Sequence, residues 1–436
     1  MQPSSGKAVN AAEVRAKHKE FLFPCVANYY EESIVLTRGD GCCVVDADGR
    51  EYLDFFGGIL TVGLGHCHPE VTAAVEEQMS QLGHTSTLYP TQPIVEVAER
   101  LAKITPGKLQ KSFFTTSGTE ADETAILLAK IFTGRDEIIA LRHGYSGRSL
   151  NALSLTGHSP WRLISTQVAG IKHAMSPYCY RCPLGLAPDS CGVRCATDIE
   201  ELIQTTTSGH PAAFIAEPIQ GVGGFITPPP EYFEIAVGIV RKYGGVFICD
   251  EVQTGFGRTG DHWCGIEHWG VEPDIMTFAK GIANGAPVGA TIATAEVADA
   301  FTGLTISTFG GNPVTMAQTR ATLDVMEREN VPKRAAERGR QLRGHLEAFK
   351  EEFAFIGDVR GMGLMQAIEL VEDRATKEPA KGKTNQLMEA AKRHGLLLGK
   401  GGLYSNVIRI APSMLVTEAE INDGAARMRR ALAEVK

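Results

Sequence analysis

The sequence predicts an α/β fold in which a large, mostly parallel sheet is flanked by helices. Two short apolar runs, Val246–Cys249 and Asp274–Ala279, are partly β-branched or aromatic, as expected of buried parallel strands. Asp250 follows the first run and Lys280 follows the second. Because the carboxyl ends of parallel strands meet at one edge of a sheet, we expect these two side chains to face one crevice.

The chain of 436 residues is long enough for two or three subdomains. We expect an N-terminal arm and part of a small domain in residues 1–59, a large domain in 60–315, and the rest of the small domain in 316–436. The arm is polar and is expected to be helical over Ala11–Phe21. Alternating residues around the turn Asp48-Gly49 then predict a small antiparallel sheet, with strands in Val35–Gly41, Cys42–Asp46 and Glu51–Phe55.

Apolar spacing predicts the elements of the large domain. Helices are expected over Glu70–Leu82, over Ile94–Ile104 and after Ser117. Besides the two runs above, strands are expected at Ser112–Thr116, Glu137–Leu141 and Ala212–Ala216, and a turn and the last strand of this domain are expected in the segment GIANGAPVGATIAT after Lys280. The stretch from Gly157 to Ser208 gives no clear period and is expected to be rich in loops.

Helices and strands alternate again in the last third of the chain. Helices are expected over Met316–Asn330, Lys333–Glu352 and Thr384–His394, and strands over Ile356–Val359, Leu364–Leu370 and Val407–Ile410. This alternation predicts an α/β C-terminal subdomain.

Composition excludes several classes of protein. A formal net charge of -8 argues against broad nucleic-acid binding. No apolar run approaches the roughly 18 residues of a membrane span. The N-terminal segment has no apolar signal core and contains Glu13 and Glu20, so we expect a cytoplasmic protein.

A carboxylate and a lysine at neighbouring strand ends are the pair that pyridoxal phosphate requires. The lysine forms a Schiff base with this cofactor, and the carboxylate keeps the pyridine nitrogen protonated so that the ring accepts electrons. Around Asp250 and Lys280 the segments DEVQTGFGRTG and AKG, with SGTEA upstream, resemble the class III aminotransferases of the fold-type I pyridoxal-phosphate enzymes. The resemblance runs from about Tyr30 to the C-terminus, and it implies that Val252 packs on the ring and Gln253 binds the ring oxygen.

The segment after Thr116 is a candidate phosphate site. Ser117, Gly118 and Thr119 precede a helix, and backbone N–H groups at a helix start together with two hydroxyls can bind a phosphate. The alternative is an ordinary helix N-cap with Glu120 in the first turn. Beside Asp250 and Lys280 we favour the phosphate site.

The resemblance also assigns substrate and cofactor contacts outside this segment. HGYSGRS is similar to a family segment in which Tyr145 would stack on the ring and Arg148 would bind a substrate carboxylate, although Ser146 replaces the usual histidine. Arg409 matches the arginine that binds the α-carboxylate of the substrate, and Glu217 matches its ion-pair partner when that carboxylate is absent. The alternatives are a core tyrosine, a surface arginine at 148, and an Arg409 that only joins two domains.

The family threonine that reaches the phosphate of the neighbouring subunit corresponds to Thr308, which implies a homodimer with shared active sites. The function we expect is transfer of an amino group from an ω-amino acid or amine to an α-keto acid (pyruvate, glyoxylate or 2-oxoglutarate) with ping-pong kinetics. GDVRGMGLMQAIELV and RIAPSM look most like the alanine–glyoxylate transaminase 2 group and its bacterial ω-amino-acid relatives. The alternatives are a phospho-lyase that acts on a phosphorylated amino alcohol and a non-catalytic binding module.

Two clusters invite a metal interpretation. His66 and His68 flank Cys67, but no third ligand stands at suitable spacing. A CxxC pair and a CxxxC pair could hold zinc through Cys179, Cys182, Cys191 and Cys195. Because pyridoxal chemistry needs no metal, we expect reduced thiols and no metal site.

Overall fold

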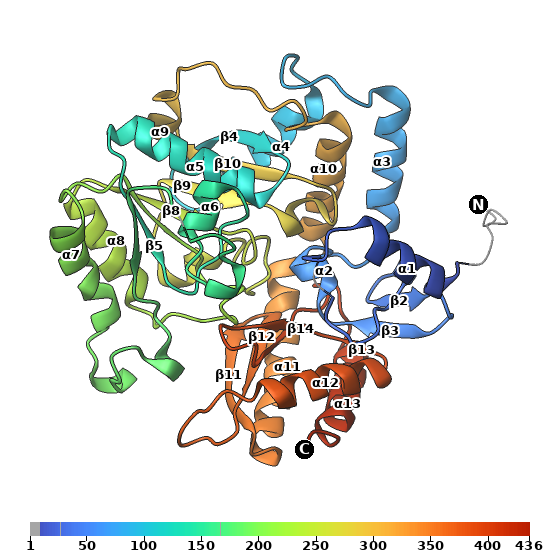
Figure 1. The fold of residues 1–436 in the computed structure, drawn as a ribbon. Coiled ribbons are helices and arrows are strands. Elements are labelled where there is room, and N and C mark those ends of the chain that lie inside the picture. The colour runs from blue at the N-terminus through green and yellow to red at the C-terminus, as the bar shows by residue number, and fades with distance from the viewer. Residues whose placement is uncertain (1–8, 27, 166) are drawn as a thin grey trace.

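The computed structural model describes residues 9–26, 28–165 and 167–436, and a seven-stranded sheet forms its larger half (Figure 1). The strand order is β4-β10-β9-β8-β7-β5-β6. Only β10 runs antiparallel to its neighbours, so the predicted mostly parallel sheet is confirmed. The strands are β4 (Leu109–Thr115), β5 (Ile138–Leu141), β6 (Ile171–Ala174), β7 (Ala213–Ala216), β8 (Val246–Asp250), β9 (Ile275–Phe278) and β10 (Gly289–Thr294).

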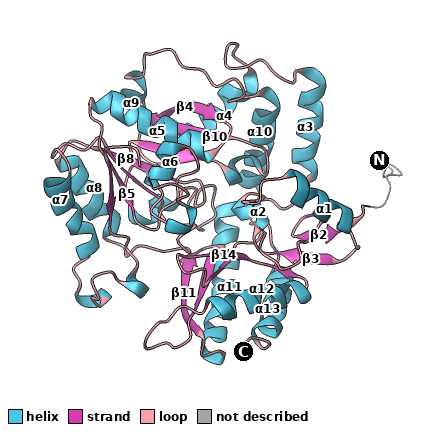
Figure 2. Ribbon diagram, in the orientation of Figure 1, coloured by secondary structure: helices cyan, strands magenta, loops and turns pink. Residues whose placement is uncertain are grey.

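Helices pack around this sheet, as Figure 2 shows. Helix α5 packs on β8, β9 and β10, and α8 packs on β7 and β8, which leaves every residue of β7, β8 and β9 buried. The continuous apolar runs predicted this burial. The helices of this half are α3 (Pro69–Gln81), α4 (Gln92–Ile104), α5 (Gly118–Thr133), α6 (Leu150–Leu155), α7 (Arg194–Thr206), α8 (Tyr232–Lys242) and α9 (Ala295–Asp299).

Two four-stranded sheets form the smaller half of the molecule. The first has the order β1-β2-β3-β13 and the second β11-β12-β15-β14. Strand β13 pairs in parallel with β3, so strands from both ends of the chain share a sheet, as the fold class implied. The strands are β1 (Leu36–Asp40), β2 (Cys43–Asp46), β3 (Glu51–Asp54), β11 (Ile356–Met362), β12 (Met365–Leu370), β13 (Leu396–Leu397), β14 (Gly399–Gly401) and β15 (Val407–Ile410).

The N-terminal strands lie beside the C-terminal helices in Figure 1, blue against red. The remaining helices are α1 (Ala11–Phe21), α2 (Gly57–Leu60), α10 (Pro313–Arg328), α11 (Val331–Glu352), α12 (Lys381–Arg393) and α13 (Glu418–Leu432). The domain boundaries at 59/60 and 315/316 stay predictions, and the first eight residues of the expected arm lie outside the described residues. No helix in the described ranges is long and apolar enough to cross a membrane.

The region expected to be loop-rich contains two elements that the sequence analysis missed. Strand β6 forms the edge of the large sheet, and its sequence, IKHA, is short and half polar. Helix α7 begins after Val193, which adopts a left-handed φ of 50° and provides no side-chain cap. Without a usual start signal or a clear apolar run, neither element stands out from sequence alone.

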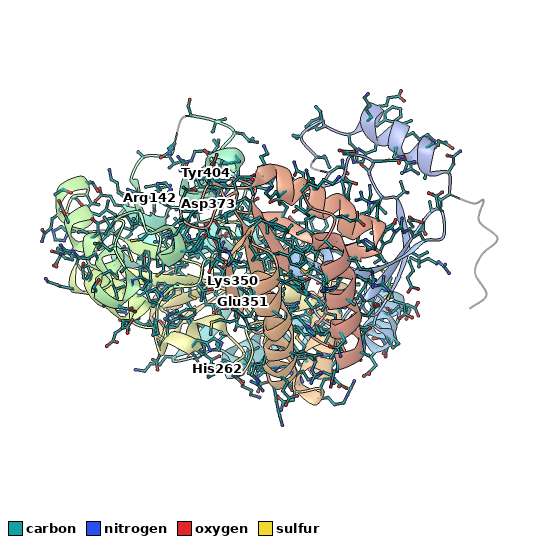
Figure 3. All side chains as sticks on the ribbon, turned by 90° about the horizontal axis from the view of Figure 1, so that it is seen from below. Arg142, His262, Lys350, Glu351, Asp373 and Tyr404 are labelled. Atoms are coloured by element: carbon teal, nitrogen blue, oxygen red, sulfur yellow. The ribbon has the colours of Figure 1, made fainter. Side chains whose placement is uncertain are left out.

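A buried ionic cluster joins the two halves. Glu369 on β12 is fully buried and accepts hydrogen bonds from Tyr178, from Arg181 Nε at 2.5 Å and from Arg360 Nη1 at 2.7 Å. Burial alone would raise the pKa of Glu369, but the charges of Arg360 and Arg181 and the hydrogen bonds from Tyr178 and Arg181 together outweigh it, and the pKa is lowered. Arg181 also stacks on Tyr404, which is labelled in Figure 3, and its Cζ lies 5.6 Å from the centre of the tyrosine ring.

We predict that Glu369→Ala lowers the free energy of unfolding by about 3–5 kcal/mol, because it leaves Arg360 and Arg181 buried without their shared carboxylate. The control is Glu372→Ala, which removes a surface carboxylate paired with Lys383 and should cost at most about 1 kcal/mol. Urea unfolding of both variants measures the difference. Equal losses would show that the buried cluster contributes no more than a surface pair.

Candidate active site

Asp250 and Lys280 lie at the carboxyl ends of adjacent parallel strands, as predicted. Asp250 ends β8 and stands opposite Thr277 of β9 in the register of the sheet. Lys280 follows β9 after one residue and adopts a φ of 46°, in the left-handed region that non-glycine residues rarely occupy. Such backbone strain is common at functional sites.

Both side chains line a cavity of about 270 Å³. The other expected site residues on its wall are Ser117, Gly118, Thr119, Tyr145, Glu217, Val252 and Gln253. These come from the start of α5, from the loop after β5 and from the ends of β7 and β8. The sheet edge therefore brings together residues that are up to 163 positions apart, from Ser117 to Lys280.

The electrostatics of the cavity follow from burial. Burial lowers the pKa of Lys280, although the charges of Asp250 and Glu217 partly offset this effect. Burial raises the pKa of Asp250, while the N–H of Val252, which donates to Asp250 Oδ1 at 3.0 Å, and the charge of Lys280 oppose the rise. The lysine is thus closer to a neutral amine than an exposed lysine, which suits a group that must take up a proton.

The start of α5 forms an open anion site. Ser117 is the N-cap, and its Oγ accepts the N–H of Glu120 at 3.3 Å. The N–H groups of Gly118 and Thr119 have no acceptor within the described chain. A Cβ at Gly118 would lie 3.2 Å from Val252 Cγ1, so glycine lets the helix start close to the end of β8. The segment is therefore both a helix N-cap and a candidate phosphate site, because the cap leaves the N–H groups of Gly118 and Thr119 free.

Glu217 and Arg409 do not form the ion pair that the sequence analysis expected. Glu217 instead accepts the N–H of Tyr145 at 3.1 Å and that of Gly221 at 2.7 Å. Arg409 donates to the carbonyls of Lys400 at 2.9 Å and Gly221 at 3.4 Å. The described ion pairs include neither residue. Backbone groups bind the two side chains separately, so the expected ion pair does not form in this structure.

The charges of these two residues are set by their surroundings. Burial, followed by the charge of Asp250, raises the pKa of Glu217 to about 8. Burial lowers the pKa of Arg409, which is 3% exposed and lies over the Phe56 ring at 4.9 Å. Its Nε has no partner among the described residues. A buried guanidinium with a free donor can bind an anionic ligand.

Three expected site residues lie off the cavity wall. Arg409 is buried behind it, whereas Arg148 and Thr308 are exposed. The structure of the single chain therefore does not bring Arg148 and Thr308 to Lys280. Their expected roles stay predictions.

Sequence reasoning missed Asp122, Thr61 and the segment Ala286–Val288, which also line the wall. Asp122 lies four residues after Gly118 on α5 and is therefore on the same helix face. This spacing from the predicted phosphate site is the signal that could have identified it.

The two candidate metal clusters have other contacts in the structure. His66 Nε2 lies 2.9 Å from Asp54 Oδ2. The cysteines at 179, 182, 191 and 195 line one small, mainly apolar hollow, and burial raises the pKa of Cys179 and Cys195. Within residues 9–26, 28–165 and 167–436, no three His, Cys, Asp or Glu side chains are arranged to hold a metal. The absence of a metal requirement stays a prediction.

The model of the family described as "Aminotransferase class-III" matches residues 26–432. The chain belongs to this family. The protein is 43% identical to alanine–glyoxylate aminotransferase 2 homolog 2, mitochondrial, of Arabidopsis thaliana over 410 residues, which cover 94% of this chain and 85% of the plant protein. The predicted family, the aminotransferase activity and the pyridoxal-phosphate dependence are confirmed.

Solved structures agree with this assignment. An (S)-enantioselective ω-transaminase from Thermomicrobium roseum has a TM-score of 0.90 and 35% identity, over 98% of this chain and 99% of that one. An amine transaminase from an uncultivated Pseudomonas species, solved in its PLP-bound form, has a TM-score of 0.90 and 31% identity. The match covers 99% of this chain and 100% of that one. The fold-type I architecture is therefore confirmed, and these comparisons give no support to a phospho-lyase.

The residues of the aminotransferase cavity fit pyridoxal phosphate. The free N–H groups of Gly118 and Thr119 suit its phosphate, and the Asp250 carboxylate suits its ring nitrogen. Gln253 Oε1 is buried without a partner in the described chain, so a polar group of a ligand can satisfy the Gln253 amide.

Proposed function

We propose that this aminotransferase moves an amino group from an ω-amino acid or an amine to an α-keto acid such as pyruvate, glyoxylate or 2-oxoglutarate. The observation that carries the proposal is a single cavity that holds Lys280, Asp250 and Glu217, with the buried Arg409 near enough for its charge to act on Lys280. Donor and acceptor share this cavity, so the kinetics are ping-pong.

In this proposal five residues of the cavity bind the cofactor in addition to Lys280. The N–H groups of Gly118 and Thr119 bind its phosphate, and Val252 and Tyr145 contact its ring. Asp250 keeps the ring nitrogen protonated. The bound cofactor supplies an electron-accepting ring.

Lys280 holds the cofactor and then transfers the proton. Burial lowers the pKa of its amine, which favours the neutral form that can remove a proton from the substrate carbon bearing the nitrogen. With the cofactor bound, the same amine would pass this proton to the cofactor carbon that takes up the nitrogen, and in the opposite half-reaction it would move a proton back from that carbon to the substrate carbon. Because Lys280 lies on the cavity wall with the β-strand ends and the start of α5, its amine is positioned beside a substrate that binds in the cavity.

Arg409 binds the α-carboxylate of the keto acid, and Arg148 binds the distal carboxylate of an ω-amino acid. Support for the first role comes from the free Nε of Arg409 and from its lack of a carboxylate partner in the described chain. Glu217 is held by two backbone N–H groups, one of them on Gly221, whose carbonyl accepts from Arg409. A movement of this one residue would affect both side chains.

We also propose a homodimer in which Thr308 reaches the site of the neighbouring subunit. Thr308 lies in a loop whose apolar side chains are exposed, including Leu304, Ile306 and Phe309. The rings of Phe309 and His84 pack with their centres 5.1 Å apart. His84 lies in the neighbouring loop, which also exposes Leu88 and Tyr89 (Figure 1). A contiguous apolar surface of this kind favours burial against a second copy of the chain. The cytoplasmic location stays a prediction.

We predict that Lys280→Ala abolishes multiple turnovers, since the variant lacks the amine that holds the cofactor and moves the proton. Lys242→Ala is the matched control, because this lysine is exposed and pairs with Glu200 at the surface. Steady-state assays with an amine donor and pyruvate measure both. Sustained turnover by the Lys280 variant without added amine would contradict the proposal.

We predict that Arg409→Ala weakens keto-acid acceptors much more than simple amines, by about 1.5–3 kcal/mol in kcat/KM, the range for a hydrogen bond to a charged group. Arg148→Ala should instead penalise ω-amino acid donors. The measurement is kcat/KM for one amine, one ω-amino acid and three keto acids. Equal losses for amines and keto acids in the Arg409 variant would indicate a structural role.

We predict that Phe309→Glu shifts the protein from dimer to monomer and weakens cofactor binding, because a charge is costly in an apolar interface and Thr308 leaves the neighbouring site. Light scattering and cofactor titration provide the two readouts. Leu184→Glu, at another partly exposed apolar residue, is the control. A Phe309 variant that stays dimeric would place the interface elsewhere.

A further inference from the structure

The cavity contains a third carboxyl group, Asp122, to which the roles above assign no task. Asp122 is 1% exposed, yet it lies on the cavity wall. Thr277 Oγ1 donates to Asp122 Oδ1 at 2.8 Å. Thr277 is also the residue that stands opposite Asp250 in the pairing of β8 with β9. This arrangement brings α5, β8 and β9 together at one point.

Asp122 and Asp250 line the same cavity wall and meet at Thr277, which donates to Asp122 and stands opposite Asp250 in the sheet. A hydrogen bond between two carboxyl groups requires one of them to be protonated, because an ionised carboxylate has no proton to donate. Burial favours the protonation of one group, because ionising two adjacent buried carboxyl groups has a large free-energy cost.

The surroundings decide which group carries the proton. Asp250 receives the N–H of Val252 at 3.0 Å and lies near the charge of Lys280, and both favour its ionised form. Among the described residues, the hydrogen bond that Asp122 accepts comes from the neutral hydroxyl of Thr277, and the other carboxyl group that acts on it is Glu217. Burial first, and then the charge of Asp250, raises the pKa of Asp122 well above its usual value.

We propose that Asp122 is a positioning residue that stays protonated and donates a hydrogen bond to Asp250. This bond fixes the orientation of the Asp250 carboxylate and lowers its basicity. In terms of the proposed function, on which this last consequence rests, the proton between Asp250 and the pyridine nitrogen then remains on the ring. The chain Thr277–Asp122–Asp250 would thus run from the sheet through α5 to the cofactor.

The protonation state is tested by infrared difference spectroscopy of the holoenzyme, wild type minus Asp122→Asn, at about pH 8. Asparagine is the matched neutral variant. We expect the carbonyl stretch of a protonated carboxylic acid in the difference spectrum. The other buried acids, Glu217 and Glu251, are present in both proteins, so their bands cancel. A difference spectrum with carboxylate bands only would overturn the proposal.

The pH dependence of stability gives a second test. Because the folded pKa of Asp122 lies above the unfolded one, its protonated form stabilises the fold below the unfolded pKa, and this contribution is lost as the pH rises toward the folded pKa. Asp122→Asn removes this dependence. We therefore expect the variant to melt at a higher temperature than the wild type at about pH 8, and the difference to shrink toward about pH 4. A difference that is constant with pH would contradict a protonated Asp122.

The positioning role is tested by comparing Asp122→Asn with Asp122→Leu. The asparagine amide can donate to Asp250 and accept from Thr277, so cofactor affinity and the pH titration of the cofactor absorbance should match the wild type. Leucine cannot donate, and cofactor binding should weaken about tenfold to a hundredfold. Unchanged binding in the leucine variant, or equal weakening in both variants, would overturn the role.

Asp250→Asn separates this inference from the proposed function. If this variant binds the cofactor and turns over like the wild type, the role of Asp250 fails, while the infrared band still decides the state of Asp122. Circular dichroism establishes whether the leucine variant is folded. If it is not folded, the infrared spectrum and the melting curves of the asparagine variant still test whether Asp122 is protonated.

Discussion

The parallel pairing of β8 with β9 is the contact on which the site depends. It sets Ile248 opposite Ile275 and Asp250 opposite Thr277, so that the two strands end together. Lys280 then follows within the same edge of the sheet. Helices α5 and α8 cover β8, and burial at this end of the sheet shifts the pKa values of Asp122, Glu217, Asp250 and Lys280.

The same burial determines how the charges are balanced. Asp122, Asp250 and Glu217 all line a cavity whose wall contributes Lys280 as its basic side chain. Protons on two of these carboxyl groups reduce an excess of negative charge that a dry cavity tolerates poorly. The backbone N–H groups of Tyr145 and Gly221 provide the remaining compensation at Glu217.

The smaller half of the molecule contributes Arg409, whose place depends on the second four-stranded sheet. Strand β15 carries Arg409 opposite Ala367 of β12, two residues before Glu369. Glu369 in turn is bound to Tyr178 and Arg181, which come from the larger half. The buried ionic cluster and the position of Arg409 are therefore parts of one connection between the halves.

The sequence by itself determined the sheet, the strand ends with Asp250 and Lys280, and the phosphate site at the start of α5, because these signals are local in the chain. It did not determine α7 and β6, whose polar and uncapped sequences lack such signals. Only the tertiary structure separated Glu217 from Arg409, through backbone groups of Gly221, and placed Asp122 against Asp250. Partners that are distant in sequence are chosen by packing, and the energy of a buried polar group depends on the neighbours that packing supplies.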